Sequence, residues 1–296
     1  MPPPVGTVNR MLASEGHVAA PDGTRLYFQA LGDAPGVLII PNGFYLLDDF
    51  RGLADRRTLL VYDLRNRGRS DAVTDESLLR GGVLRDVDDL EAVRRHFGLE
   101  KVELLGHSYV ATMIALYAMR SPDRVRRAIQ IGPPPPQYGQ QYPPDLMHAD
   151  ATRDDVFAKL GALQSQRPSM DPQKFCERAW SELRRIYVVD EANAHRIDWG
   201  RCDLENERNF MRYWLQNIVP SLQALSLTAQ DYARADMPFL TIHGRKDRSA
   251  PYGGGLEWAS RLPDAHLVTV DDAAHAPWIE APRLVFDAIT AFLAER

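Results

Sequence analysis

The sequence has 296 residues, of which 45% are hydrophobic, 25% charged and 9% aromatic, which suits one large domain with an insertion. Its 35 Lys and Arg residues against 40 Asp and Glu residues give a net charge of -5, which argues against nucleic acid as a partner. No apolar run approaches the roughly eighteen residues of a membrane span, residues 1–16 lack a signal-peptide pattern, and the two cysteines suit reduced thiols. We therefore expect a soluble, cytoplasmic protein with no membrane partner.

Apolar segments of strand length alternate with helical patterns over most of the chain. Two alternating segments, Glu15–Ala19 and Thr24–Ala30, flank a Pro-Asp-Gly turn and predict an antiparallel hairpin. Six further segments are almost wholly apolar, which is typical of parallel strands covered on both faces. They are Val37–Ile40, Thr58–Tyr62, Val102–Leu105, Val125–Ile131, Phe239–Ile242 and His266–Val270. Helices are predicted at Val83–Phe97, Ser108–Arg120 and Arg283–Leu293, so the order is that of an α/β fold with a mostly parallel sheet flanked by helices.

Residues 133–235 interrupt this alternation. They contain no convincing strand, only the helical periodicity of Arg153–Leu163, Lys174–Val188 and Leu204–Val219. The segment begins with Pro133–Pro136, which we interpret as a stiff spacer, the alternative being a ligand for a partner domain. We predict a core domain of residues 1–132 and 236–296, with residues 133–235 inserted as a helical cap, or lid. Such an insertion can cover the sheet edge where α/β proteins bind ligands.

A serine lies at the junction between a predicted strand and the helix that follows. A sharp turn there would hold the Ser108 hydroxyl out of the backbone, with the start of the helix behind it. The turn needs small neighbours, which Gly106 provides on one side, whereas Val110 stands where a second glycine is usual. The alternative is a serine that only caps the helix.

Two later strands are followed by an aspartate and a histidine, Asp247 and His275. Serine is a poor nucleophile until a histidine takes its proton and a buried carboxylate fixes the imidazole tautomer. Because the carboxyl ends of parallel strands meet at one edge of a sheet, we expect Ser108, Asp247 and His275 to form a catalytic triad. Separately, each could be a turn or loop residue; together and in this order they favour catalysis.

With these residues in place, the sequence resembles the α/β-hydrolase superfamily over nearly its whole length. The resemblance is most specific at Gly106–Val110, at Asp247 and at Ala273–Pro282, where the His is followed by a Glu-x-Pro that opens the last helix. It implies an α/β-hydrolase fold with a helical cap and serine-hydrolase activity. The segment Asp63–Ser70 resembles a loop of the epoxide-hydrolase, dehalogenase and proline-iminopeptidase branches, in which Arg65 would be a structural anchor. A serine at position 108 argues against the first two branches, which use an aspartate nucleophile.

Acyl transfer also requires donors for the developing oxyanion, usually two backbone N–H groups. We expect one from Tyr109, directly after the nucleophile, and one from Phe44 in the loop that follows the strand Val37–Ile40. Members of the family usually have His-Gly in that loop, whereas this sequence has Asn42-Gly43, where Asn42 could brace the loop. The alternative is a plain Asn-Gly turn.

Aromatic residues near the predicted site indicate an apolar pocket, with Tyr45 and Trp278 as lining residues because they flank the catalytic loops. This pocket predicts a carboxylesterase-like enzyme acting on small to medium carboxylic esters. An alternative is an aminopeptidase of the proline-iminopeptidase type, in which cap carboxylates hold the substrate amine. The candidates are Glu177, Glu182, Glu205 and Glu207. A second alternative is a non-hydrolytic ligand-binding or biosynthetic relative, which the unusual Val110 and Asn42 would suit.

No cofactor or metal is predicted. Gly253–Gly255 lacks the strand-loop-helix setting of a nucleotide-binding loop. The histidines show no helix-spaced ligand pattern; those considered are His17, His107, His148 and His195. The expected partner is a small-molecule ester or a short peptide, and the sequence leaves the oligomeric state open.

Overall fold

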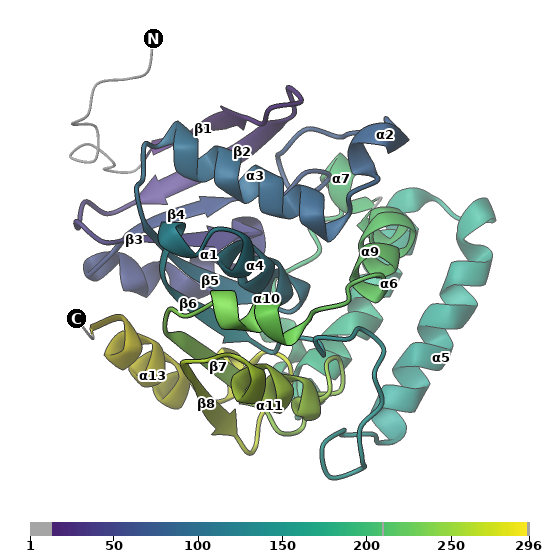
Figure 1. Ribbon diagram of the computed structural model, residues 1–296. Helices are drawn as coiled ribbons and strands as arrows, with labels where there is room; N and C mark the ends of the chain where they lie inside the picture. Colours follow the sequence, from purple (N-terminus) through teal and green to yellow (C-terminus); the bar gives the residue numbers. More distant parts are fainter. Residues whose placement is uncertain (1–13, 209, 295–296) are drawn as a thin grey trace.

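The computed structural model describes residues 14–208 and 210–294, which form an eight-stranded sheet with helices around it (Figure 1). The strands are β1 (Ser14–Ala19), β2 (Arg25–Leu31), β3 (Val37–Pro41), β4 (Thr58–Tyr62), β5 (Val102–His107), β6 (Val125–Ile131), β7 (Phe239–Gly244) and β8 (Ala265–Val270). Their order in the sheet is β1-β2-β4-β3-β5-β6-β7-β8. The hairpin β1-β2 and the pair β2-β4 are antiparallel, and the remaining pairs are parallel. The predicted α/β fold is confirmed. Most of the segment tested for a signal peptide lies outside the described residues.

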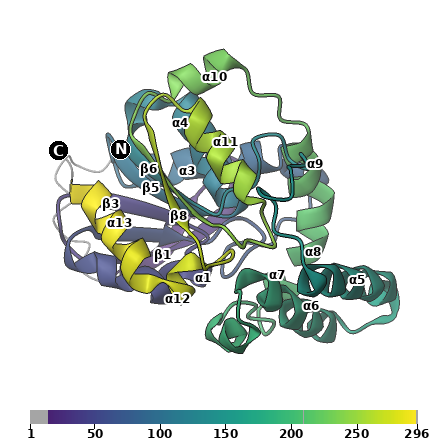
Figure 2. The same ribbon diagram turned by 90° about the horizontal axis from the view of Figure 1, so that it is seen from below.

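Helices cover both faces of the sheet (Figure 2). One face carries α3 (Val83–His96), α4 (Tyr109–Arg120), α10 (Ala229–Arg234) and α11 (Tyr252–Arg261); the other carries α1 (Gly43–Phe50), α12 (Pro277–Glu280) and α13 (Pro282–Ala294). Shorter turns are η2 (Arg51–Asp55), α2 (Glu76–Leu79) and η3 (Pro122–Arg124). Successive residues of a strand point to opposite faces, so Ile39 belongs to one apolar cluster and Ile40 to the other. This explains why central strands such as β3 and β4 are almost wholly apolar.

The inserted segment is helical, and none of its described residues forms a strand. Its elements are α5 (Ala151–Gln166), η4 (Arg167–Ser169), α6 (Pro172–Tyr187), η5 (Glu191–Arg196), α7 (Glu205–Arg208), α8 (Phe210–Tyr213), the π-helix η6 (Trp214–Ile218) and α9 (Val219–Gln223). In both ribbon views α5 and α6 lie to one side of the sheet and its helices. The helix predicted over 204–219 is found as helical residues at 205–208 and 210–223, with a π-helical turn at Trp214–Ile218. The boundaries of a separate cap domain stay a prediction.

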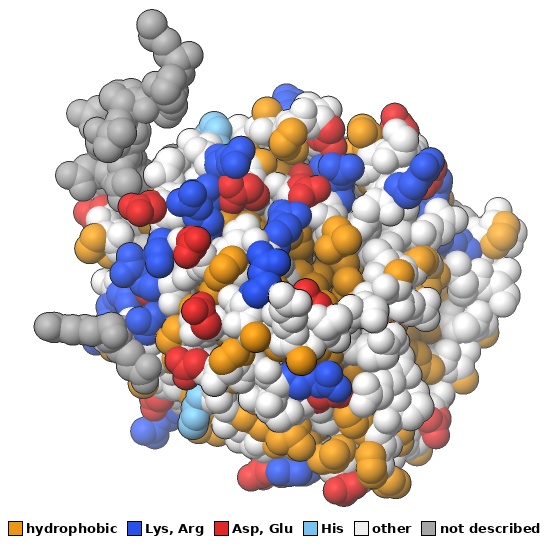
Figure 3. All heavy atoms as spheres, in the orientation of Figure 1, with side chains coloured by type: hydrophobic (Ala, Val, Ile, Leu, Met, Phe, Trp, Pro, Cys, Tyr) orange, Lys and Arg blue, Asp and Glu red, His pale blue; other side chains and the backbone are white. Residues whose placement is uncertain are grey.

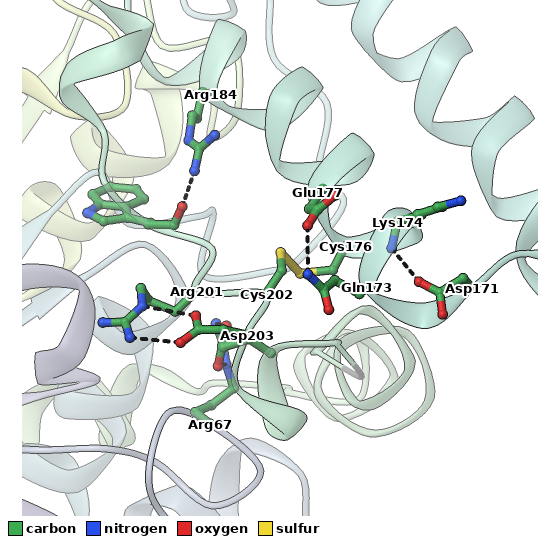
Figure 4. The surroundings of a disulfide bond; sticks show 12 residues. Arg67, Asp171, Gln173, Lys174, Cys176, Glu177, Arg184, Arg201, Cys202 and Asp203 are labelled. Atoms are coloured by element: carbon green, nitrogen blue, oxygen red, sulfur yellow. Dashed lines mark hydrogen bonds and ion pairs between the residues drawn. A yellow bond between two sulfur atoms is a disulfide. The ribbon is translucent and has the colours of Figure 1, made fainter.

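A disulfide joins Cys176 of α6 to Cys202 (Figure 4). It lies inside the inserted segment, next to the ion pair between Arg201 and Asp203. This corrects the expectation of two reduced thiols: two cysteines are too few for a disulfide framework but enough for one bridge within the cap. The argument from free thiols to a cytoplasmic location therefore loses its basis.

Two further findings concern the charges on the surface and the length of the helices. On the face shown in Figure 3, basic and acidic side chains are interspersed. Across the described part of the chain, no helix is long and apolar enough to cross a membrane.

Candidate active site

Ser108 occupies the turn between β5 and α4 in a strained backbone conformation. Its φ of 58° and ψ of -134° are rare for a residue other than glycine. A Cβ atom at Gly106 would lie 2.6 Å from the carbonyl oxygen of Val110, so only glycine fits there. Val110 itself is buried in the core, 2% exposed, and the turn forms without a second glycine.

Asp247 and His275 follow β7 and β8 and are hydrogen-bonded to each other. The distance from His275 Nδ1 to Asp247 Oδ2 is 2.7 Å, and both side chains are fully buried. Asp247 Oδ1 accepts from the backbone N–H groups of Ser249 (2.7 Å) and Ala250 (2.8 Å), and its Oδ2 lies 3.2 Å from His243 Nε2. Burial raises the pKa of Asp247, but His275 and His243 outweigh it and hold that pKa well below its usual range. Asp247 is therefore ionised at neutral pH.

The other ring nitrogen of His275, Nε2, is buried and makes no hydrogen bond to any described residue. The ring of His107, the residue before Ser108, lies 4.5 Å from the His275 ring, and His107 Nε2 donates to the His275 carbonyl (2.9 Å). Burial lowers the pKa of His107 well below its usual value, so this donor is a neutral imidazole. The structure thus brings the histidine loop against the serine turn, without a hydrogen bond between Ser108 and His275.

Ser108 faces a cavity of about 480 Å³ between the core and the cap. Most of its wall is aromatic or aliphatic and comes from the cap, including Tyr138, Phe157, Leu160, Trp180, Leu183, Tyr187, Trp199, Phe210 and Trp214. The core contributes Asn42, Tyr45, Arg67, His107, Ser108, Tyr109 and Ser249. No Asp or Glu is found among the described residues that line it. Such a cavity suits an apolar acyl or alcohol group.

Trp278 does not line this cavity, which corrects its predicted role in the pocket. It is 2% exposed, and its ring packs against His107 (centroids 4.9 Å apart) and Phe50 (5.2 Å). Its Nε1 donates to Asp49 Oδ2 (2.9 Å). Trp278 therefore supports the residue next to the nucleophile from behind, a position that closeness to His275 in the chain could not reveal.

The two expected oxyanion donors have different surroundings. Tyr109 is the first residue of α4, so its N–H has no acceptor within the helix and bonds to no other described residue. The Phe44 N–H, by contrast, donates to Asp63 Oδ1 (3.1 Å). Phe44 is not among the residues that line the cavity. The structure commits this N–H to a buried carboxylate, which differs from the predicted role of Phe44.

The described cavity wall includes none of the four cap carboxylates that were considered for amine binding. Glu207 is fully buried and accepts from Arg67 Nε (3.0 Å), Arg67 Nη2 (3.1 Å) and the Gly68 N–H (3.0 Å). Glu177 accepts from Gln173, and Glu182 from Arg185. Glu207 instead ties α7 to the Asp63–Ser70 loop, a pairing that the sequence did not suggest because the two partners are 140 residues apart.

Arg65 is held by Asp89 through two hydrogen bonds of 2.7 Å, as suits a structural anchor.

Glu280 holds the loop that carries His275 in place. Its Oε2 accepts from the Ala274 N–H (2.8 Å) and its Oε1 from the Val189 N–H (2.7 Å). The Ala276 N–H also donates to the Tyr187 carbonyl (2.9 Å). The loop that carries His275 is therefore fastened to the end of α6, and the Glu-x-Pro pattern was its signal.

Among the described residues, no group of three or more His, Cys, Asp or Glu side chains is placed to hold a metal ion. That the protein needs no metal or cofactor stays a prediction.

Comparisons with known proteins agree with this architecture. The model of a family described as the alpha/beta hydrolase fold matches residues 36–282, so the chain belongs to that family. A proline iminopeptidase from Heyndrickxia coagulans is 24% identical over 92% of this chain and 96% of its own, and a (lyso)-N-acylphosphatidylethanolamine lipase from Bos taurus is 33% identical over 83% and 74%. Among solved structures, an esterase from Exiguobacterium antarcticum matches with a TM-score of 0.72 at 17% identity, covering 95% of this chain and 100% of that one. The protein is an enzyme, a hydrolase of the α/β-hydrolase fold.

Proposed function

We propose that the protein is a serine hydrolase that cleaves small to medium carboxylic esters through an acyl-enzyme on Ser108. The observation that carries this proposal is the buried Asp247–His275 pair beside a strained serine turn that opens onto an apolar cavity. Asp247 fixes the imidazole with the proton on Nδ1, which leaves Nε2 as the base.

The chemistry then takes two steps. Ser108 Oγ attacks the ester carbonyl carbon while its proton passes to His275 Nε2, and that proton leaves with the alcohol as the C–O bond breaks. Water attacks the acyl-enzyme in the second step and gives up its proton to the same nitrogen, which returns it to Ser108 as the acid departs. The Tyr109 N–H is the expected donor to the oxyanion in both steps.

The aminopeptidase alternative is weaker, although a proline iminopeptidase is among the relatives. Binding a protonated amine in a buried cavity calls for a carboxylate, and none lines this one in the described chain. The non-hydrolytic alternative is disfavoured because the named relatives are hydrolases.

A side-by-side panel of short and medium acyl esters and of proline and alanine anilides tests the proposal. We expect the esters to be cleaved faster and Ser108→Ala to abolish turnover while the fold persists. Faster cleavage of the anilides, or an active Ser108→Ala variant, would contradict it.

A further inference from the structure

The loop between β3 and α1 offers one polar side chain to the cavity, that of Asn42. Asn42 is 7% exposed and lines the same cavity as Ser108. Its backbone is left-handed, with φ 64° and ψ 38°, a conformation that Asn tolerates better than most residues. Asn42, for which the family resemblance led us to expect histidine, is therefore at the wall of the site.

The side-chain amide of Asn42 has no partner among the residues that the structure describes. Its Oδ1 is buried and accepts no hydrogen bond, and its Nδ2 donates to no other described residue. Buried amide groups in folded proteins are nearly always paired, so an unpaired amide at a cavity wall is open to a bound group or to water. Because neither end of the amide is held, rotation about its last bond can present the NH₂ group to a ligand.

The neighbouring backbone donor is already engaged. The Phe44 N–H donates to Asp63 Oδ1, and Asp63 Oδ2 accepts from the Arg69 N–H (2.9 Å), so the carboxylate holds two segments of the core together. Releasing the Phe44 N–H toward an oxyanion would break a buried contact. The Asn42 amide needs no such rearrangement.

We propose that the Asn42 side-chain amide, together with the Tyr109 N–H, stabilises the oxyanion formed on Ser108. This inference rests on the proposed function and names a further catalytic residue for it. As Ser108 Oγ bonds to the carbonyl carbon, the carbonyl oxygen gains the electron pair and accepts from Asn42 Nδ2; when the tetrahedral intermediate collapses, that pair re-forms the carbonyl. A side-chain amide can do this work as well as a backbone N–H.

The test uses two variants that preserve the left-handed backbone. Asn42→Gly removes the amide, and Asn42→Asp keeps its shape but replaces the donor by an acceptor. The matched control is Asn66→Gly, because Asn66 is also left-handed (φ 58°), its Oδ1 accepts from the Val73 N–H, and it is not among the described residues that line the cavity.

We expect Asn42→Gly and Asn42→Asp to lower kcat by about 10²–10³-fold with KM changed less than about threefold, as for the loss of one oxyanion donor. The affinity for a trifluoromethyl ketone, which forms a tetrahedral adduct on serine, should fall by the same factor as kcat/KM. Asn66→Gly should keep wild-type kinetics and ketone affinity.

Two results would overturn the proposal. One is an Asn42→Gly variant with wild-type kcat and ketone affinity. The other is a loss confined to KM and thermal stability, which would make Asn42 a brace for the loop. Failure of the proposed function looks different, since the wild type would then neither hydrolyse esters nor form an adduct with the ketone.

Discussion

The two sides of the candidate site differ in how far their polar groups are already bonded. On the side of β7 and β8, Asp247 is surrounded by two backbone N–H groups and two imidazoles, and Glu280 fastens the His275 loop to the cap. On the side of β3 and β5, the Tyr109 N–H and the Asn42 amide have no partner in the described protein. Asp247 and the His275 loop are fixed before substrate arrives, and only His275 Nε2 is left unpaired there, whereas both groups that would meet the developing charge are left for the substrate.

This difference in hydrogen bonding affects the stability of the fold. An unpaired buried donor or acceptor costs about 1–3 kcal/mol, whereas a satisfied network stabilises the fold. We therefore expect changes on the Asp247 side to reduce both catalysis and stability, and removal of the Asn42 amide to reduce catalysis alone. The predictions that follow test this contrast.

The largest effect is expected for Asp247→Asn. Asn cannot hold the His275 proton on Nδ1 in the same way, so kcat for ester hydrolysis should fall by about 10⁴-fold. The matched control is Asp272→Asn, since Asp272 is exposed in the loop before His275 and, in the described part of the chain, pairs only with Lys246. A loss below tenfold in Asp247→Asn, or an equal loss in the control, would show that the buried pair is structural.

A second prediction concerns Asp63, which occupies the Phe44 N–H. Burial is the main cause that raises the pKa of Asp63 from its ordinary value to about 7, against the lowering effect of the hydrogen bonds from Arg69 and Phe44. A raised folded-state pKa means that the stability from Asp63 is present at pH 4 and is lost as pH rises to about 7. The free energy of unfolding of the wild type relative to Asp63→Asn should therefore fall by up to about 4 kcal/mol over that range.

Denaturant unfolding of both proteins at several pH values measures this difference. A difference that is constant from pH 4 to 7.5 would mean that Asp63 is ionised throughout, and that the Phe44 N–H is held by a charged carboxylate.

Reduction of the disulfide is expected to cause a smaller loss in the free energy of unfolding. Cys176 and Cys202 are 26 residues apart, and opening a loop of this length lowers the free energy of unfolding by about 3 kcal/mol. The bridge lies in the cap, where Trp180 and Trp199 line the cavity, so KM should rise more than kcat falls. The measurement compares the wild type with and without reductant, and the Cys176→Ser/Cys202→Ser variant should not respond to reductant. An unchanged wild type in reductant would contradict the prediction.

The sequence predicts best those strands whose apolar pattern has one physical cause, burial on both faces of the sheet. The central strands are covered on both faces, so their apolar runs give strand positions such as Val125–Ile131 directly. The helix α11 was not predicted, and three consecutive glycines, Gly253–Gly255, are unfavourable in a helix. A Cβ at Gly255 would lie 2.2 Å from His243 Nδ1, so close packing against β7 accounts for that glycine.

The features of the site also divide into those that the sequence predicts and those that it does not. Asp247 and His275 could be predicted because one follows the buried strand β7 and the other the edge strand β8, and the ends of parallel strands converge. The contacts of Phe44, Trp278 and Glu207 could not, because each depends on a partner from a distant segment that no local pattern indicates. The disulfide was missed for the same reason.

The central claim is that Ser108 is a nucleophile activated by His275. Labelling with a fluorophosphonate, followed by mass-spectrometric mapping of the modified peptide, tests it most directly. We predict a single adduct on Ser108 that forms rapidly in the wild type and at least about 10³-fold more slowly in His275→Ala. An adduct on another residue, or equal labelling of Ser108 in the two proteins, would contradict the claim.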